Sequence, residues 1–314
     1  MPKVSVIIPT RNRRVLLTSA INSVMVQTFQ DFEIIVVDDG SEDNTREIVE
    51  EMKSKKIRYI SHEIQKGEAA SRNTGIMNAT GDFIAFLDDD DEWLPEKLSL
   101  QIEFLEKREE HVGAIYTGYL FINMENKRVF CQKRAEVRGD ISKDLLCDNV
   151  IGTPSSVLLR KQVINRIGLF DEKLPYYVDY DFFIRISKHF HFEYINRPLV
   201  KYHVHQEMLS KDPYIMLQGL EKLLEKYSNN KGDKVSNRFI GKQYTKIGKI
   251  FYNNENYCHS RKTFKKSILW NPFQYKGYLF LLSSFVKIDN FYKVKPVMNK
   301  LQKHLNSIKV RKLL

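Results

Sequence analysis

The stretch FIAFLDDDDEWLPEKL, residues 83–98, places an apolar run directly before four consecutive aspartates. Adjacent carboxylates repel one another, and burial increases the repulsion unless a cation lies among them. Oxygen ligands at the end of a strand suit Mg²⁺ or Mn²⁺, which bind one or two carboxylates together with substrate phosphates. The alternative is a solvated acidic turn before a helix that begins near Pro95, because acidic residues suit a helix N-terminus. The apolar strand favours the metal site.

The first hundred residues alternate between strand and helix patterns around this stretch. Val- and Ile-rich runs without polar alternation, separated by helices, predict a mostly parallel α/β sheet of Rossmann-like type covered by helices. Ligands bind such sheets at the carboxyl ends of the strands, where DDGS (residues 38–41) and DDDD (residues 88–91) both lie. Asn44 and Glu47 stand at capping-box spacing. The expected strands are 4–9, 32–38, 56–60 and 82–88, and the expected helices are 14–27, 44–52, 68–81 and 94–110.

The rest of the chain divides into a mixed part and a basic helical part. Strand and helix patterns mix from about residue 111, and after about residue 211 the chain is predicted to be helical, with breaks near residues 228–233 and Pro272. We therefore expect one domain at 1–210, with halves at 1–110 and 111–210, and a basic α-helical region at 211–314.

Charge separates the same two parts. Of 314 residues, positions 201–314 contain 23 Lys/Arg and 7 Asp/Glu, whereas positions 1–200 are net acidic and the whole chain is +11. A basic region could meet nucleic acid, an anionic membrane or only water. Three scattered cysteines predict a reducing compartment and no metal cluster. We expect no signal peptide, and the longest apolar run, 278–286, is too short to span a membrane.

Two further acidic motifs could take part in chemistry. The chain has no GxGxxG or P-loop motif, so if its amino-terminal half binds a nucleotide, it must do so through side chains and a metal. Asp38 or Asp39 could accept hydrogen bonds from a base or ribose, or simply form a strand–turn–helix connection. Asp179 and Asp181 precede an amphipathic stretch, where an acid is either a general base or a helix cap.

Five ordered blocks resemble family 2 glycosyltransferases. They are VSVIIPTRN, QTFQDFEIIVVDDGSEDNT, AASRNTGIMNATGDFIAFLDDDDEWLPEKL, SSVLLRKQVINRIGLFDEKL and DYDFFIRI, which together cover roughly residues 3–210. The resemblance implies the GT-A fold, a DxD-like metal element and sugar transfer with inversion. It also implies that residues 1–110 bind the nucleotide-sugar donor and residues 111–210 bind the acceptor. The only tryptophans are Trp93 and Trp270, so the QxxRW element of processive relatives is absent. Transfer of a single sugar, of the non-processive bacterial type, is therefore expected.

The resemblance also assigns roles to individual residues. Asp179 matches the general base, and Asp90 is the expected direct metal ligand with Asp91 beside it. Arg11 stands where relatives often carry an aromatic residue, and Val178 where they often carry Glu. The expected nucleotide-binding residues are Pro9, Thr10, Arg11, Asp38, Asp39, Arg72, Asp88 and Asp89, and the expected metal-site residues are Asp88, Asp90 and His205.

The leading prediction is a Mn²⁺- or Mg²⁺-dependent enzyme of surface-polysaccharide synthesis. It takes a sugar from UDP, or else dTDP, to an oligosaccharide or lipid-linked acceptor. It is expected in the cytoplasm, bound peripherally to the inner face of the membrane through its basic region. It is not expected to bind nucleic acid. One alternative is a nucleotidyltransferase, which usually has a Gly-rich, basic phosphate loop near the first strand. The run PTRNRR (residues 9–14) is basic but lacks glycine, which counts against this alternative. The other is a basic membrane-surface or nucleic-acid-binding protein with a degenerate nucleotide site.

Overall fold

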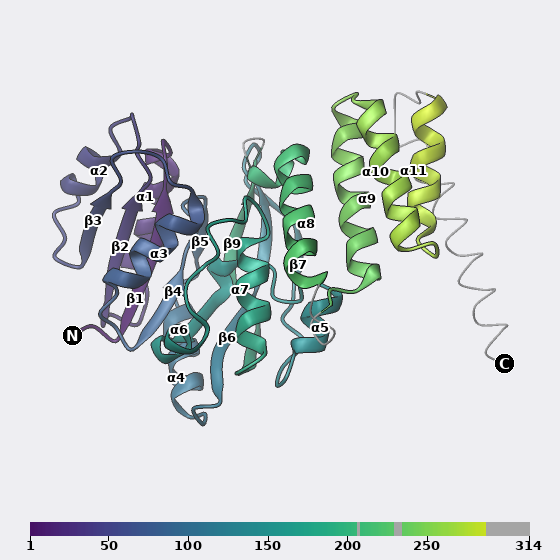
Figure 1. Ribbon diagram of the computed structural model, residues 1–314. Helices are drawn as coiled ribbons and strands as arrows, with labels where there is room; N and C mark the ends of the chain where they lie inside the picture. Colours follow the sequence, from purple (N-terminus) through teal and green to yellow (C-terminus); the bar gives the residue numbers. More distant parts are fainter. Residues whose placement is uncertain (206–207, 229–233, 287–314) are drawn as a thin grey trace. The chain divides into compact units, whose positions relative to one another are not determined.

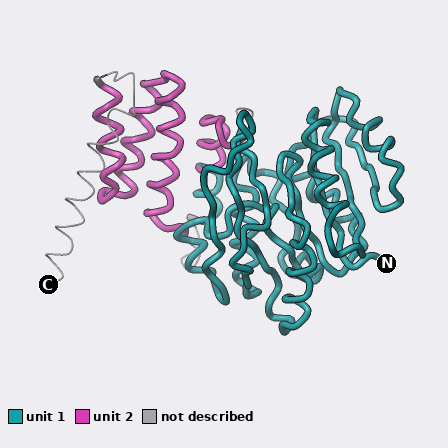
Figure 2. The backbone as a smooth tube through the Cα atoms, turned by 180° about the vertical axis from the view of Figure 1, so that it is seen from behind, with its two compact units in different colours: residues 1–209, 221–234 teal, residues 210–220, 235–314 magenta. Residues whose placement is uncertain are grey.

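The computed structural model describes residues 1–205, 208–228 and 234–286. The chain divides into two compact units, residues 1–209 with 221–234 and residues 210–220 with 235–314 (Figure 2). The division falls inside one helix, whose first turns belong to the second unit and whose last turns belong to the first. The expected domain boundary at residue 210 remains a prediction.

The first unit is built on a nine-stranded sheet with helices packed against it (Figure 1). The strand order is β3-β2-β1-β4-β8-β6-β9-β5, and β7 pairs with β6 outside this path. The strands are β1 (Val4–Thr10), β2 (Phe32–Asp38), β3 (Ile57–Ser61), β4 (Phe83–Phe86), β5 (Asp91–Trp93), β6 (Val112–Asn123), β7 (Arg128–Lys133), β8 (Val157–Arg160) and β9 (His191–Val204).

The first four strands have the predicted parallel arrangement. β1 pairs in parallel with both β2 and β4, and β2 pairs in parallel with β3. Every residue of β1, β2 and β4 is buried, which explains why these Val- and Ile-rich runs lack polar alternation. The register pairs Thr10 with Asp38, so the chain segments that follow β1 and β2 leave the sheet side by side.

Beyond β4 the sheet is mixed. β8 is antiparallel to β4 and β6, and β5 is antiparallel to β9, whereas β6 and β9 are parallel. Residues 87–90 therefore connect β4, in the middle of the strand order, with β5 at its end. β5 has only three residues and was not expected from the sequence. The acidic stretch thus occupies the crossing between the parallel and mixed halves.

Helices of the first unit follow the predicted spacing, with two differences at their starts. Asn44 makes no side-chain cap; Asp43 accepts a hydrogen bond from the Thr45 amide at 3.2 Å instead, so the predicted capping box is wrong. The helix expected near Pro95 begins at Lys97. The helices are α1 (Arg14–Met25), α2 (Thr45–Glu51), α3 (Glu68–Asn78), α4 (Lys97–Glu106), α5 (Ser142–Cys147), α6 (Lys161–Ile167) and α7 (Val178–Ser187), with 3₁₀ turns η1 (Pro154–Ser156) and η2 (Leu209–Lys211).

The second unit is helical, as the sequence predicts. It contains the start of α8 (Pro213–Ser228), followed by α9 (Asn237–Asn253), α10 (Tyr257–Trp270) and α11 (Tyr275–Val286). Phe264 of α10 stacks on Phe280 of α11 with ring centroids 5.4 Å apart. The predicted break at Pro272 separates α10 from α11, and residues 229–233 of the other predicted break lie outside the described residues. Among the described residues, no helix combines the length and apolar character needed to cross a bilayer.

Candidate active site

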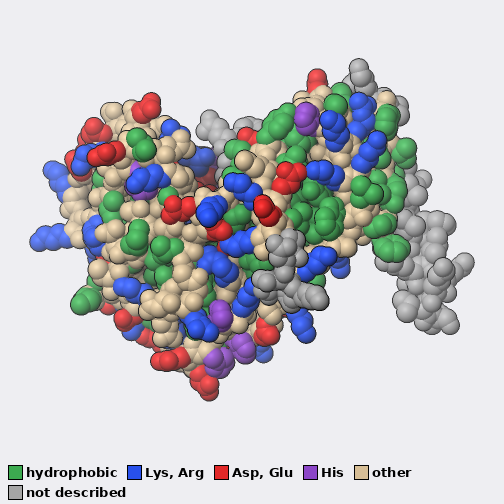
Figure 3. Space-filling view, viewed as in Figure 1, with side chains coloured by type: hydrophobic (Ala, Val, Ile, Leu, Met, Phe, Trp, Pro, Cys, Tyr) green, Lys and Arg blue, Asp and Glu red, His purple; other side chains and the backbone are tan. Residues whose placement is uncertain are grey.

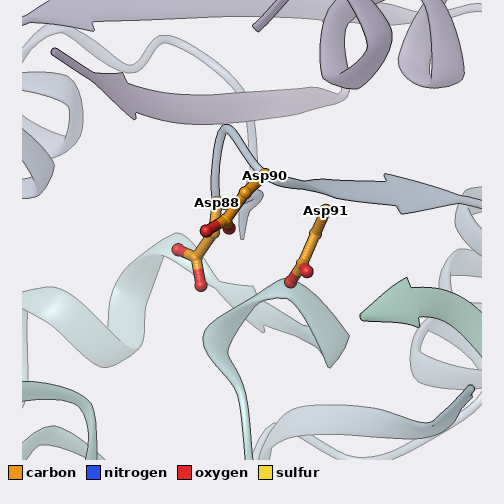
Figure 4. A group of neighbouring side chains, drawn as sticks. All are labelled: Asp88, Asp90 and Asp91. Atoms are coloured by element: carbon orange, nitrogen blue, oxygen red, sulfur yellow. The ribbon is translucent and has the colours of Figure 1, made fainter. Parts of the chain in front are cut away.

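Three of the four consecutive aspartates come together after β4. Asp88, Asp90 and Asp91 each offer a carboxylate oxygen, and these oxygens all lie within 4.8 Å of one another (Figure 4). Asp89 has other partners: one of its oxygens accepts a hydrogen bond from the Thr10 hydroxyl at 2.8 Å, and the other accepts one from Arg13 at 3.1 Å. The structure therefore assembles a three-carboxylate cluster and holds the fourth aspartate apart from it.

The electrostatics of this cluster fit a divalent cation. Burial, followed by repulsion from Asp90 and Asp88, raises the pKa of Asp91 well above its usual range. Burial also raises the pKa of Asp88, against the opposing effect of Arg72. Among the described residues, Oδ2 of Asp91 is buried without a hydrogen-bond partner. A divalent cation would neutralise the shared negative charge and supply a partner for that oxygen.

Arg72 of α3 stands at the edge of the cluster. Its side chain is almost entirely buried, and Nη2 lies 2.6 Å from Oδ1 of Asp88. The same guanidinium forms an ion pair with Glu68 one turn earlier on α3. Among the described residues, the Nε atom of Arg72 is buried without a partner. Arg72, which was predicted to approach the diphosphate, is thus a buried and paired cation directly beside the acidic cluster.

Asp179 lies in the first turn of α7, within the electrostatic influence of Arg72. Burial raises the pKa of Asp179 to about 6, with Arg72 lowering it and Glu68 raising it. Its Oδ1 accepts a hydrogen bond from the Tyr180 amide at 2.8 Å. A carboxyl group with this pKa is ionised at neutral pH and remains basic enough to accept a proton, which suits a general base.

The second acid of the same motif has a different environment. Asp181 is fully buried and forms ion pairs with Arg185 at 2.9 Å and Lys226 at 2.8 Å. It also accepts a hydrogen bond from the Tyr227 hydroxyl at 2.9 Å. All of these partners are side chains of the folded protein, so Asp181 has a structural role in fixing α7. Asp179 therefore remains the candidate catalytic residue of the motif.

The residues expected to bind the nucleotide base lie at the ends of β1 and β2. Pro9 and Thr10 are buried at the end of β1, whereas Arg11 beyond them is exposed. Asp38 accepts hydrogen bonds from the Ser41 amide at 2.8 Å and from the Tyr59 hydroxyl. Asp38 therefore helps to fix the loop that follows β2 at this edge of the sheet.

Asp39 is more heavily hydrogen-bonded than Asp38. It contacts His62 Nδ1 at 2.8 Å and accepts hydrogen bonds from the backbone amides of Lys66 and Gly67 at 2.8 and 2.7 Å. Burial raises the pKa of Asp39, but these hydrogen bonds lower it, and the one to His62 has the largest effect among them. The pKa of Asp39 is therefore held below its usual range. Asp39 is thus an ionised, fixed acceptor, and its contact with a base stays a prediction.

Four further side chains contact the aspartate run, and of these only His205 was expected from the sequence to lie at the site. The expected His205 lies 2.9 Å from Oδ2 of Asp90, and Arg13 approaches the same oxygen at 3.3 Å. His203 Nδ1 lies 2.7 Å from the carbonyl oxygen of Asp90, and the hydroxyl of Ser155 accepts a hydrogen bond from the Asp88 amide at 3.1 Å. The basic run PTRNRR was the only sequence signal for Arg13.

Comparison with known proteins gives the family of a chain with this fold and this acidic site. The family model described as "Glycosyl transferase family 2" matches residues 5–168. The chain belongs to glycosyltransferase family 2, as the five sequence blocks predicted, and it is a glycosyltransferase. This membership favours sugar transfer over the nucleotidyltransferase alternative.

Relatives in several bacteria support the same assignment. The chain is 31% identical over 226 residues to the uncharacterized glycosyltransferase RP339 of Rickettsia prowazekii, covering 71% of this chain and 70% of that one. It is 41% identical over 120 residues to Escherichia coli WfgD, a UDP-Glc:alpha-D-GlcNAc-diphosphoundecaprenol beta-1,3-glucosyltransferase, covering 38% and 47%. It is 37% identical over 171 residues to a GalNAc(5)-diNAcBac-PP-undecaprenol beta-1,3-glucosyltransferase of Campylobacter jejuni, covering 53% and 54%. The matches to the last two thus span only about half of each relative.

Solved structures confirm the fold. Staphylococcus aureus TarS 1-349 in complex with UDP-GlcNAc matches with a TM-score of 0.57 and 19% identity, covering 90% of each chain. The mannosyltransferase PcManGT of Pyrobaculum calidifontis, in complex with GDP-Man and Mn²⁺, matches with a TM-score of 0.56 and 16% identity, covering 91% of this chain and 86% of that one. The GT-A fold with a helical C-terminal region is therefore confirmed.

Proposed function

We propose that this enzyme moves one sugar, with inversion, from a UDP-sugar to a hydroxyl of a lipid-linked oligosaccharide. The names of two relatives support the acceptor class, because both act on sugars linked to undecaprenol through a diphosphate. UDP as the carrier is supported by the UDP-Glc donor named for WfgD and by the UDP-GlcNAc complex of a structural neighbour.

The acidic cluster is proposed to hold the metal that stabilises the diphosphate leaving group. Asp88, Asp90 and Asp91 would hold Mn²⁺ or Mg²⁺, which neutralises a diphosphate as it leaves the sugar. The Mn²⁺ in the PcManGT complex supports this choice of metal class. His205 and Arg13 both contact the Asp90 carboxylate and so help to orient it. Arg72 adds a fixed positive charge beside Asp88.

The acceptor side falls to Asp179. As the base, its carboxylate takes the proton from the acceptor hydroxyl while that oxygen attacks the anomeric carbon. The bond to the diphosphate breaks on the opposite face of the sugar, through an oxocarbenium-like transition state, and the configuration inverts. Pro9, Thr10, Arg11, Asp38 and Asp39 are proposed to bind the nucleoside, with Asp89 fixed to Thr10 at 2.8 Å.

The observation that carries this proposal is the placement of Arg72 between the two halves of the chemistry. It pairs with Asp88 of the metal cluster and lowers the pKa of Asp179. One buried cation therefore acts electrostatically on both the leaving-group site and the proposed base, where charge changes during the transfer. A membrane-peripheral location in the cytoplasm follows from the lipid-linked acceptor and belongs to the same proposal.

Thermal stabilisation by donors tests the site before any acceptor is known. A ligand that binds only the native state raises the melting temperature. We expect UDP with Mn²⁺ to raise it more than dTDP, GDP or CDP with Mn²⁺, and more than UDP alone. Asp179→Asn should keep this shift and lower sugar transfer by at least about a hundredfold. No shift with any nucleoside diphosphate would overturn the proposed donor site.

A further inference from the structure

Five large apolar side chains of α10, α11 and the connection between them are exposed. Leu269 is 79% exposed and Phe273 is 93% exposed, at the junction of α10 and α11. On α11, Tyr278, Leu282 and Phe285 are also exposed, and their spacing of four and three residues places them on one helix face. We call these five residues the apolar patch. Five large exposed apolar side chains within residues 269–285 are more than scattered single exposures and are typical of a binding surface.

Basic side chains border the apolar patch. Arg261 of α10 donates a hydrogen bond to the Ser284 carbonyl at 3.3 Å, and its guanidinium lies 5.0 Å from the ring of Phe285. Lys262 and Lys265 are exposed on α10. Residues 235–286 contain nine Lys/Arg and one acid. Figure 3 shows hydrophobic and basic side chains gathered over α9 to α11, with few acidic ones.

The charge and the side-chain types of this surface together determine which partner it can bind. A second copy of the chain would bring two strongly basic faces together. Residues 287–314, which follow α11, contain eight Lys/Arg and one acid, so they carry the same sign. Nucleic acid would complement the charge and could stack on the three aromatic members of the patch, but Leu269 and Leu282 cannot stack on bases and would lie exposed beside them. A surface with Leu and Phe beside Lys and Arg fits the interface of an anionic bilayer.

We propose that the apolar patch inserts into the interface of an anionic phospholipid membrane while the lysines and arginines of α10 bind the lipid head groups. This inference rests on the proposed function, because a lipid-linked acceptor resides in such a membrane. It adds to that function the surface that recruits the enzyme there. The binding is peripheral, since its apolar contribution comes from side chains and its electrostatic contribution weakens as salt screens the charges.

Tryptophan fluorescence gives the test a built-in reporter. Trp93 is buried in the first unit at 2% exposure, whereas Trp270 is half-buried at the end of α10, beside Leu269. The full chain is mixed with vesicles of phosphatidylcholine alone or mixed with phosphatidylglycerol, each with and without brominated acyl chains. We expect co-sedimentation with the anionic vesicles, weakened by salt, and quenching by brominated lipid that Trp270→Phe abolishes.

Matched variants separate the patch from exposed apolar residues in general. Leu282→Ser with Phe285→Ser should lower the partition coefficient on anionic vesicles about tenfold. Val15→Ser with Val26→Ser removes side chains at α1 that are 70% and 60% exposed, and should leave it unchanged. Equal binding to neutral and anionic vesicles, or no quenching of Trp270, would overturn the proposal.

The melting temperature and the rate of sugar transfer add two further readouts. If the Leu282 and Phe285 variant lowers the melting temperature without vesicles and leaves partitioning unchanged, the patch is covered within the protein or by a second copy, and the proposal is wrong. Sugar transfer to a lipid-linked oligosaccharide dispersed in detergent, without vesicles, is measured in parallel. Vesicle binding without any transfer would contradict the proposed function alone, and transfer without vesicle binding would contradict the docking surface alone.

Discussion

The pH dependence of sugar transfer tests Asp179 as the general base. Burial raises the pKa of Asp179 to about 6 from an ordinary 3.8. A general base must be ionised, so the rate rises with pH through this pKa. The ionised fraction falls from about nine tenths at pH 7 to about one tenth at pH 5, which lowers kcat about tenfold. A carboxylate with an ordinary pKa would lose only about a tenth of its activity over this range.

The assay measures kcat from pH 5 to pH 8.5 at saturating donor, Mn²⁺ and acceptor. Bound metal keeps its ligands ionised, so that their titration does not produce the acid limb. Glu68→Gln removes a negative charge that raises the pKa of Asp179, so the limb should move to lower pH. Glu110→Gln, an exposed residue after α4, should not move it. A rate that stays constant between pH 5 and pH 7 would refute the assignment, as would a limb that Glu68→Gln leaves in place.

Three other substitutions probe the metal site and the fold. Asp90→Asn should raise the Mn²⁺ concentration needed for thermal stabilisation by UDP at least about tenfold; an unchanged Mn²⁺ titration would exclude Asp90 as a ligand. Lys97 is fully buried, and burial lowers its pKa well below 10.5, so the unfolded state binds the proton more tightly than the native state and stability rises with pH between the two pKa values. Urea unfolding at pH 7, 8 and 9 should show this gain, up to about 1.4 kcal/mol per pH unit, in the wild type but not in Lys97→Met. In Gly75→Ala the new Cβ would lie 2.3 Å from Cγ2 of Ile7, which should cost about 1–3 kcal/mol; an unchanged urea midpoint would contradict this packing.

The sequence predicted the parallel half of the fold because burial on both faces leaves a direct record in composition. β1 and β2 are continuous Val- and Ile-rich runs, and each is followed by turn residues at the edge where ligands bind. The mixed half left no such record. β5 has three residues, and its pairing with β9 depends on contacts more than a hundred positions away in sequence.

The candidate site was predictable where residue types alone limit the chemistry. Four adjacent aspartates indicated a cation site. The sequence did not show that the turn of the folded backbone directs Asp89 toward Thr10 and away from the other three. Likewise, the motif around Asp179 did not distinguish its two acids, because the partners of Asp181 include Lys226 and Tyr227 from a distant helix. The contacts of Arg13 and Ser155 with the aspartate run also depend on the folded sheet.

The stereochemistry of the product tests the central claim most directly. The purified enzyme is incubated with α-linked UDP-glucose or UDP-GlcNAc, Mn²⁺ and an undecaprenol-diphosphate-linked oligosaccharide, and the products are analysed by NMR. We expect release of UDP and a new β-glycosidic bond, because Asp179 is proposed to activate the acceptor on the face opposite the metal-bound diphosphate. An α-linked product, or release of UMP or pyrophosphate, would contradict it.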